Sequence, residues 1–458
     1  MKKENRNVRG VALLPFLLFI GIYLGAGLVI QRQGGEMAFY QFPPVTAMFI
    51  AVMVAFFMTR GSIEERFAVF AAGIGKKDVI TMLVIYLLAG AFSAVAAEMG
   101  GRDATVNMGL SFVRADHLAA GIFLISAFMG TATGSSMGTV SAVVPIAAGI
   151  AEKSGLDLPL VVGACVGGAM FGDNLSMISD TTIAATRSQG CGMKDKFRMN
   201  FLVALPAAVV TLFLLLVTGK PATQVALGDL SYRVIKVLPY LTVLILALLG
   251  VSVFAVLTIG IALSGLIGMG LGDLTVLTFA RAVWTGFTSM NEVFFLTFLC
   301  AGMSEMIRHN GGITWLLKAF DRKIKGQRSA QGGIALLVAL VDCATANNTV
   351  AIILTGDLAR DISRTYKVDP RKTASLLDIF SCVVQGIMPY GAQLLTAAAL
   401  VNLSVSEKTC SATDLMFSVK YCFLLALFAL LAIVIPYADG TIRRNPWDYE
   451  AGRPKSQK

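Results

Sequence analysis

Long apolar stretches alternate with short polar ones along most of the 458 residues of this chain. The runs long enough to cross a lipid bilayer, alone or divided in two, lie near residues 11–30, 43–58, 78–97, 200–218, 235–270, 291–303 and 415–437. A membrane-spanning helix needs about 20 predominantly apolar residues. The pattern therefore predicts an all-α polytopic membrane protein.

Two segments do not fit the pattern of a simple span. Residues 118–150 contain the polar stretch "GTATGSSMGTVS", and residues 330–356 contain "DCATANNTVA". Each segment is too long for one crossing and too short for two. A re-entrant hairpin fits both, because polar backbone at membrane depth is tolerated where it lines a cavity inside the protein.

The distribution of basic residues favours the hairpin model. With both segments as hairpins the chain makes ten full spans, both termini are cytoplasmic, and 28 of the 38 Lys and Arg residues lie on the cytoplasmic side. Single crossings in their place reduce that number to 23, which agrees less well with the positive-inside rule. Lys196 belongs to the cytoplasmic set, in a loop with Lys194 and Arg198. The expected location is a cell membrane, the bacterial inner membrane.

The chain also contains an internal repeat. Sliding the sequence along itself until residue 132 falls on residue 344 aligns Ala132–Gly138 with Ala344–Val350, Asp157 with Asp369, and Phe171–Thr182 with Val383–Leu394. Five crossings in each half make the second copy inverted, which is the architecture of many secondary transporters. The predicted organisation is a first repeat over residues 1–220 (hairpin 118–150, broken helix 158–186), a second repeat over 221–440 (hairpin 330–356, broken helix 371–400), and a cytoplasmic tail over 441–458.

The candidate chemistry lies in "FGDNLSMISDTT", residues 171–182, where two carboxylates interrupt an apolar run. On a continuous helix Asp173, Ser176 and Asp180 would share one face, with Thr181 beside them. Hard cations such as Na⁺ are bound by several oxygen ligands, and burial disfavours the charged form of a carboxyl group, so Na⁺ and H⁺ could compete for these side chains. The alternative is structural: Asp173 caps a half-helix and Asp180 pairs with a lysine across the bundle.

The second half offers a matching set of polar residues. The candidates for a substrate site or second-half site are Ser135 and Ser136 at the first hairpin tip, Asn347, Asn348 and Thr349 at the second, and Asp378 and Gln385 in the second broken helix. Close packing of membrane helices is the alternative role for the small polar residues. Asp342 and Asp378 could each carry a proton or partner a nearby Lys or Arg.

"GDNLSMISDTT" resembles the Gly-Asp-Lys-x-Ser-Pro-x-Ser-Asp-Thr-Thr signature of the NhaC-type Na⁺/H⁺ antiporter family, which belongs to the ion-transporter superfamily. The resemblance implies an ion site, with Na⁺ at Asp173 and Asp180, formed by Gly172, Asp173, Ser176, Ser179, Asp180, Thr181 and Thr182. The sequence departs from the signature at Asn174, where Lys is frequent, and at Met177, where Pro is frequent. Members of the family also exchange organic solutes.

The predicted function is Na⁺/H⁺ antiport by alternating access. The alternative is an ion-coupled carrier or exchanger of a small organic solute, an amino acid or a dicarboxylate or hydroxy acid, for which Asn347, Asn348, Gln385, Tyr390 and Gln393 would line the site. We expect no Lys or Arg in the membrane beside the carboxylates, which disfavours an organic anion. A channel is a third class, but broken helices in inverted repeats favour alternating access.

Composition excludes several other functions. Only 14% of the residues are charged, against roughly 25% in soluble domains, and there are two histidines. The sequence contains no CxxC pair, Walker loop or HExxH motif. Neither an enzyme nor an ATP-driven pump is predicted, and no cofactor is expected. The net charge of +10 is assigned to cytoplasmic loops and not to nucleic-acid binding. The expected partners are the bilayer, Na⁺ and H⁺, and a homodimer is one possible assembly.

Overall fold

The structure is a computed structural model that describes residues 10–35, 38–113, 117–219, 231–249, 251–312, 314–315, 326–389, 391–404 and 410–455. These residues are almost entirely helical. The strands among them are β1 (Trp447–Asp448) and β2 (Arg453–Pro454), which form one short antiparallel pair near the C-terminus.

The helices before residue 220 are η1 (Gly10–Leu13), α1 (Leu14–Arg32), α2 (Ala38–Gln41), α3 (Pro44–Met58), α4 (Ile63–Ile74), α5 (Lys77–Glu98), α6 (Gly101–Ser111), α7 (Leu118–Thr133), α8 (Ser136–Ser154), α9 (Leu158–Leu175), α10 (Asp180–Gln189) and α11 (Met193–Thr218).

The later helices are η3 (Val234–Lys236), α12 (Leu238–Leu249), α13 (Val253–Leu271), α14 (Val276–Ser289), α15 (Asn291–His309), α17 (Gln327–Thr345), α18 (Asn348–Thr365), α19 (Pro370–Ile387), α20 (Ala392–Ser404), α21 (Ala412–Met416), α22 (Lys420–Val434), η4 (Tyr437–Asp439) and α23 (Gly440–Arg444).

Seven helices among the described residues are long and apolar enough to cross a membrane, counting α9 with α10, α14 with α15 and α19 with α20 as single stretches. The stretch from α22 to α23, bent by 70°, is an eighth candidate. Two runs that we counted as spans give shorter helices, because α3 has 15 residues and α12 has 12. A multi-pass membrane protein is therefore confirmed, whereas the count of ten spans stays a prediction.

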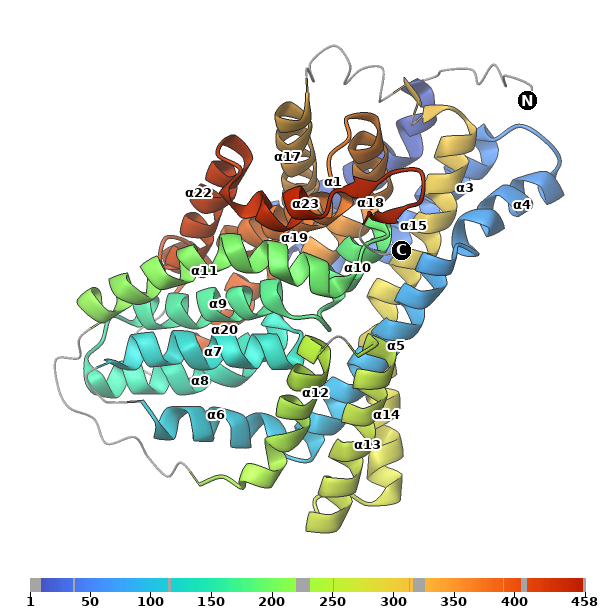
Figure 1. Cartoon of the computed structure of the whole chain (residues 1–458). Coiled ribbons are helices and arrows are strands. Elements are labelled where there is room, and N and C mark those ends of the chain that lie inside the picture. Colours follow the sequence, from blue (N-terminus) through green and yellow to red (C-terminus); the bar gives the residue numbers. More distant parts are fainter. Residues whose placement is uncertain are drawn as a thin grey trace.

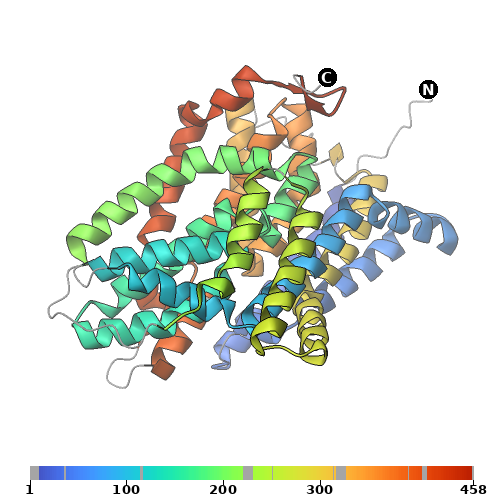
Figure 2. The same ribbon diagram turned by 60° about the horizontal axis from the view of Figure 1, so that its bottom comes forward.

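The helices form two groups with different directions (Figure 1). In one group α7, α8, α9 and α11 lie stacked and roughly parallel, and in the other α4, α5, α13, α14 and α15 run steeply across the view. Figure 2, turned by 60°, shows the same separation, with α5, α13 and α14 beside the stacked group. The short helix α10 joins the groups because it packs against α5, α11, α18 and α19.

The two predicted hairpins turn in nearly the same way. Between α7 and α8, Gly134 has φ 68° and ψ 26°, and between α17 and α18, Ala346 has φ 52° and ψ 25°. The next residue is extended in both turns, with φ and ψ of −146° and 111° at Ser135 and −150° and 112° at Asn347. Both side chains then cap the following helix by accepting a backbone N–H, from Gly138 at 3.0 Å and from Val350 at 3.1 Å.

The helices after the hairpins also correspond. Helix α9 covers positions 158–175 and α19 covers positions 370–387, while α10 begins at 180 and α20 at 392. All three bounds keep the offset of the sequence repeat, which aligns 132 with 344. Asp157 and Asp369 cap the first turns of α9 and α19 through their carboxylates. Each half thus has a hairpin of two helices followed by a helix that ends and is succeeded by a second helix with the same offset.

Candidate ion-binding site at the first helix break

The candidate site lies where α9 ends and α10 begins. Helix α9 ends at Leu175, residues 176–179 are not helical, and α10 begins at Asp180. We expected Asp173, Ser176 and Asp180 to share one face of a continuous helix, and this expectation is wrong because the helix is broken between them. The break has its own stabilising bonds: the Ser176 hydroxyl oxygen accepts the Ile178 N–H at 3.3 Å, and the Ser176 carbonyl oxygen accepts the Thr182 hydroxyl at 2.7 Å. The break itself brings the two carboxylates together.

Asp173 lies in the last turn of α9, and only 4% of its surface is exposed. One carboxylate oxygen accepts the Ser136 hydroxyl of α8 at 2.8 Å, and the other accepts the Ser179 hydroxyl from the break. The Ser179 oxygen lies 2.8 Å from the hydroxyl oxygen of Thr181. Three of the predicted hydroxyl residues are thus gathered around Asp173, and one of them comes from the first hairpin.

Asp180 is the first residue of α10 and connects the two halves of the chain. One carboxylate oxygen accepts the Thr349 hydroxyl at 2.8 Å, from the second hairpin tip, and the other accepts the backbone N–H of Thr181 at 2.9 Å. A negative charge is favourable at a helix N-terminus. In the part of the chain that the structure describes, neither Asp173 nor Asp180 forms an ion pair, so the alternative in which Asp180 pairs with a lysine is not seen there.

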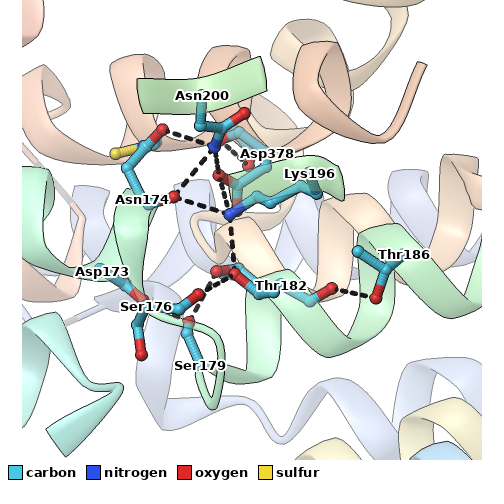
Figure 3. A network of polar contacts seen from close by, with 12 residues as sticks. Asp173, Asn174, Ser176, Ser179, Thr182, Thr186, Lys196, Asn200 and Asp378 are labelled. Carbon is cyan, nitrogen blue, oxygen red and sulfur yellow. Dashed lines mark hydrogen bonds and ion pairs between the residues drawn. The ribbon is translucent and has the colours of Figure 1, made fainter. Parts of the chain in front are cut away.

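A buried lysine that we did not predict lies beside the break (Figure 3). Lys196, in the first turn of α11, has no exposed surface, and its Nζ donates to the Asn174 carbonyl oxygen and the Thr182 hydroxyl, each at 2.7 Å. The same Nζ forms an ion pair with Asp378 on α19 at 2.7 Å. Two expectations are therefore wrong: Lys196 does not lie in a loop, and a basic side chain does lie near the carboxylates. Three oxygen partners offset the cost of burying the ammonium group.

Asn200, one turn after Lys196, completes this cluster. Its Nδ2 donates to Asp378 at 2.6 Å, to the carbonyl oxygen of Asn174 at 2.9 Å and to the side-chain oxygen of Asn174 at 3.1 Å (Figure 3). The cluster binds the carbonyl end of α9 to α19 of the other half. Two polar residues four positions apart at the start of an apolar helix, Lys196 and Asn200, are the sequence signal that indicates such an inward-facing pair.

The other predicted residues of the second half have local partners. Asn347 caps α18, and the Asn348 side-chain oxygen accepts the backbone N–H of Thr349 at 3.0 Å. Ser135 is the corresponding cap of α8. Tyr390, considered for an organic solute, lies outside the described residues. Ser136 and Thr349 are therefore the hairpin residues whose hydroxyl groups contact the two carboxylates.

A chain of hydrogen bonds leads from Asp173 to the second hairpin. Ser136, which donates to Asp173, accepts from the Gln393 amide at 3.3 Å. The side-chain oxygen of Gln393 accepts from Gln385 Nε2 at 2.7 Å, and the same nitrogen donates to the Ala346 carbonyl oxygen at 3.1 Å. The turn of the second hairpin is thus connected to the first carboxylate through side chains alone.

A narrow cavity of about 50 Å³ lies between α5, α10, α15 and α18, and the residue of α10 nearest to Asp180 in its lining is Ala184. Its lining includes Lys76, Arg187, Thr297, Cys300, Asp357 and Arg360. Tyr86 on α5 is fully buried beside Thr297, and its hydroxyl group lies within electrostatic range of Asp180. The charged residues Lys76, Asp357 and Arg360 are part-exposed, so the cavity connects a charged surface with the inner hydroxyl groups.

The model of the Na⁺/H⁺ antiporter family matches residues 8–220 and 223–434, which is nearly the whole chain. The chain belongs to this family. It is 25% identical over 363 residues to the Na⁺/H⁺ antiporter NhaC of Alkalihalophilus pseudofirmus, covering 73% of this chain and 79% of the relative. It is 23% identical over 442 residues to the arginine/ornithine antiporter ArcD of Halobacterium salinarum, covering 88% of both chains.

A further relative is the malate-2H⁺/Na⁺-lactate antiporter of Bacillus subtilis, which is 27% identical over 215 residues. That match covers 47% of this chain and spans less than half, 45%, of the relative's length. The predicted class, a secondary transporter of the Na⁺/H⁺ antiporter family, is confirmed by the family match. A family of transporters also agrees with the expectation that the chain is not an enzyme.

Two solved transporter structures share the fold. The Alcanivorax borkumensis YdaH transporter has a TM-score of 0.56 at 12% identity, covering 94% of this chain and 99% of the other. Neisseria gonorrhoeae MtrF, described as representing a class of antimetabolite efflux pumps, has a TM-score of 0.58 at 11% identity, covering 93% and 95%. At these identities the likeness concerns the fold alone.

Proposed function

We propose that this member of the family exchanges Na⁺ and H⁺ at Asp173 and Asp180, which bind the two ions in turn as the site faces alternate sides of the membrane. The observation that carries the proposal is the pairing of two carboxylates, the buried Asp173 and the part-buried Asp180, with hydroxyl groups and not with basic side chains. An ionised carboxylate without a cation is costly in a buried site. The pair therefore favours a bound cation or a bound proton.

The hydroxyl groups suit both states of such a site. A Ser or Thr hydroxyl has one donor and two acceptor lone pairs, and its hydrogen rotates to suit the partner. Ser136, Ser179 and Thr349 donate to the carboxylates here. With Na⁺ present, the same oxygens can turn their lone pairs toward the ion, which prefers several oxygen ligands. Thr181 adds a further oxygen through Ser179.

The buried Lys196 does not change the proposed cargo. Its ammonium group already has three partners, Asp378, Asn174 and Thr182, so none of its three N–H groups is left to donate to an organic anion. The amide nitrogens of Gln385 and Gln393 likewise donate to groups within the protein. These contacts favour transport of ions alone over the alternative of an organic solute.

Two observations support the proposed inverted repeat and alternating access. The segments matched by the family model, 8–220 and 223–434, agree with the two proposed halves, and the helix bounds in the two halves keep the offset of the sequence repeat. The bond between Asp180 and Thr349 crosses between the halves. Relative movement of the halves would therefore open and close the site, as in other transporters built from broken helices.

The cavity between α5, α10, α15 and α18 is the proposed access route to Asp180 from one side. Lys76, Arg187 and Arg360 line it, and we place that face in the cytoplasm together with both termini. The proposed membrane is the bacterial inner membrane, and a homodimer is compatible with the proposal.

Transport by purified protein in liposomes tests the proposed site. Asp173→Asn and Asp180→Asn retain the size of the side chains but remove the charge that Na⁺ and H⁺ would share, so each variant should lose Na⁺-driven proton flux. Thr349→Ala should retain flux with a weaker apparent affinity for Na⁺, because one oxygen of several is lost. Asp361→Asn, on α18 and paired with Arg308, is the matched control. Wild-type flux in either aspartate variant would make that residue structural.

A further inference from the structure

Asp342 is a further buried carboxyl group, remote in sequence from the first helix break. It lies in the last turn of α17, has no exposed surface, and neither carboxylate oxygen has a hydrogen-bond partner among the described residues. No described basic residue forms an ion pair with it. A buried carboxyl group without donors is rare in proteins, and in membrane helices such a group usually has a function.

Gln385 on α19 is the neighbour of Asp342 across the bundle. Its backbone N–H faces the Asp342 carboxyl group, and its side-chain oxygen is also buried without a hydrogen-bond partner among the described residues. The amide nitrogen of Gln385 donates to the carbonyl oxygen of Ala346, at the hairpin turn one helical turn beyond Asp342. Three side-chain oxygens of these two neighbouring residues thus lack a hydrogen-bond partner in the described part of the chain, and oxygen ligands are what a hard monovalent cation prefers.

The repeat explains why a site should exist there. The alignment that places 132 on 344 also places Gly130 on Asp342 and Asp173 on Gln385. In the first half Gly130 packs so closely on α9 that an added Cβ would lie 3.3 Å from the Asp173 nitrogen and 2.7 Å from the Ala169 oxygen. In the second half the corresponding hairpin position carries the carboxylate and the corresponding broken-helix position carries an amide.

We propose that Asp342 and Gln385 form a second position for a monovalent cation, H⁺ or Na⁺, which is the counterpart of Asp173 in the other half. The carboxylate of the second half lies on the hairpin arm, whereas that of the first half lies on the broken helix. A proton would form an O–H bond on Asp342 that can donate to the Gln385 oxygen, and Na⁺ would be bound by the oxygens of both side chains. This inference rests on the proposed exchange at Asp173 and Asp180 and adds one ion to it.

The two positions are connected. Gln385 donates to Gln393, Gln393 donates to Ser136, and Ser136 donates to Asp173. A cation at Asp342 would withdraw the Gln385 side-chain oxygen toward itself and so act on the amide that holds Gln393. Occupancy of one position therefore affects the geometry of the other, and one transport cycle would carry the ions of both.

The coupling ratio of exchange tests the inference. In proteoliposomes, opposing Na⁺ and pH gradients are varied until net flux is zero, and the balance point gives the number of H⁺ per Na⁺. Asp342→Asn matches the shape of a protonated carboxyl group but binds no cation. We expect it to continue exchange with a balance point shifted by one monovalent cation per cycle. A lower H⁺/Na⁺ ratio identifies the lost ion as H⁺, and a higher ratio identifies it as Na⁺.

A double variant and a control make the result specific. D342G/Q385D reproduces in the second half the arrangement of Gly130 and Asp173, so it should restore the wild-type balance point. D361N should leave that point unchanged. If D342N does not fold, Asp342→Ser is measured in its place, with the same expected shift.

Two outcomes overturn the inference. One is an unchanged balance point in D342N or D342S. The other is complete loss of exchange in the folded variant, as expected for D173N, because Asp342 would then belong to a single shared site. Failure of the proposed function is distinguishable, since wild-type protein itself would then show no Na⁺-dependent proton flux.

Discussion

The side chain of Lys196 shows how a charge can be stable inside this bundle. Its ammonium group has three oxygen partners at 2.7 Å, and one of them, the Asn174 carbonyl, lies at the end of a half-helix, where carbonyl groups lack an intrahelical donor. Asn174 is also where the family signature often carries Lys. In this chain the cationic group at the same helix end is therefore supplied by Lys196 of α11 and not by the residue at position 174.

We predict that Lys196→Met is strongly destabilising. Removing one partner of a buried ion pair leaves the other uncompensated, which typically costs about 3–5 kcal/mol. K196M should lower the unfolding temperature in detergent far more than Arg198→Met, an exposed substitution two residues further along the same helix. The double variant K196M/D378L should recover part of the loss because no charge is then left buried. Equal unfolding temperatures for K196M and R198M would contradict the assigned pair.

The residues of the site were only partly predictable. Asp173 and Asp180 could be found because carboxylates are rare in apolar runs, so their presence is informative without a structure. Lys196 could not be found in that way, since Lys194 and Arg198 beside it read as a basic loop. Whether such a residue faces lipid, water or the bundle depends on where α11 begins and how it is rotated, and the sequence next to Lys196 does not determine the rotation.

At the scale of helices, close contact between α7 and α9 positions Asp173. An added Cβ at Gly172 would meet the Ala127 oxygen and lie 2.6 Å from the Thr131 nitrogen, so the two backbones touch. We predict that Gly172→Ala separates the helices and costs about 1–3 kcal/mol, as overpacking usually does. Gly149→Ala on α8 is the control, because nothing lies within 4 Å of its added Cβ. Thermal unfolding compares the two, and equal stability would show that α7 can move without strain.

The cavity between α5, α10, α15 and α18 makes a second prediction about helices. Ser304 on α15 lines it and is part-exposed, whereas Cys422 is fully buried against α19, close to Gly386. In a background without other cysteines, a small charged methanethiosulfonate should modify Ser304→Cys and slow exchange, and Na⁺ should slow the modification by holding the site occupied. A variant that keeps only Cys422 should not react. Modification of S304C with no effect on flux would remove the cavity from the ion route.

The positions of helix breaks were predictable, but their local geometry was not. Gly and polar residues in apolar runs indicated interruptions near 134, 176, 346 and 388, and helices end at or next to these places. The i, i+3, i+7 face assumed for Asp173, Ser176 and Asp180 failed because it requires unbroken helical periodicity. Once four residues leave the helix, only three-dimensional contacts such as that from Asp180 to Thr349 decide which oxygens meet.

At the scale of the whole molecule, the predicted topology can be tested with introduced thiols. The native Cys191 and Cys410 lie in loops that the prediction puts on opposite sides, but both are buried. Arg198→Cys and Thr413→Cys, at exposed positions in a background without other cysteines, are better probes. In intact cells an impermeant maleimide should label only T413C, and both should react once the membrane is opened. Labelling of R198C in intact cells would exclude a cytoplasmic α10–α11 connection.

Which solute the protein carries also depends on the whole molecule, because residues of both halves form the site. Asp180 is completed by Thr349 from the second half, Lys196 is neutralised by Asp378, and no free basic group is left in this cluster to bind an organic anion. In proteoliposomes with an acidic interior, external Na⁺ alone should therefore drive protons out. The apparent Na⁺ affinity should fall as external pH falls, because protons and Na⁺ bind the same carboxylates. If proton flux began only after an amino acid or a dicarboxylate was added, ions alone would not be the cargo, and Gln385 and Gln393 would be the first residues to mutate in search of the solute site.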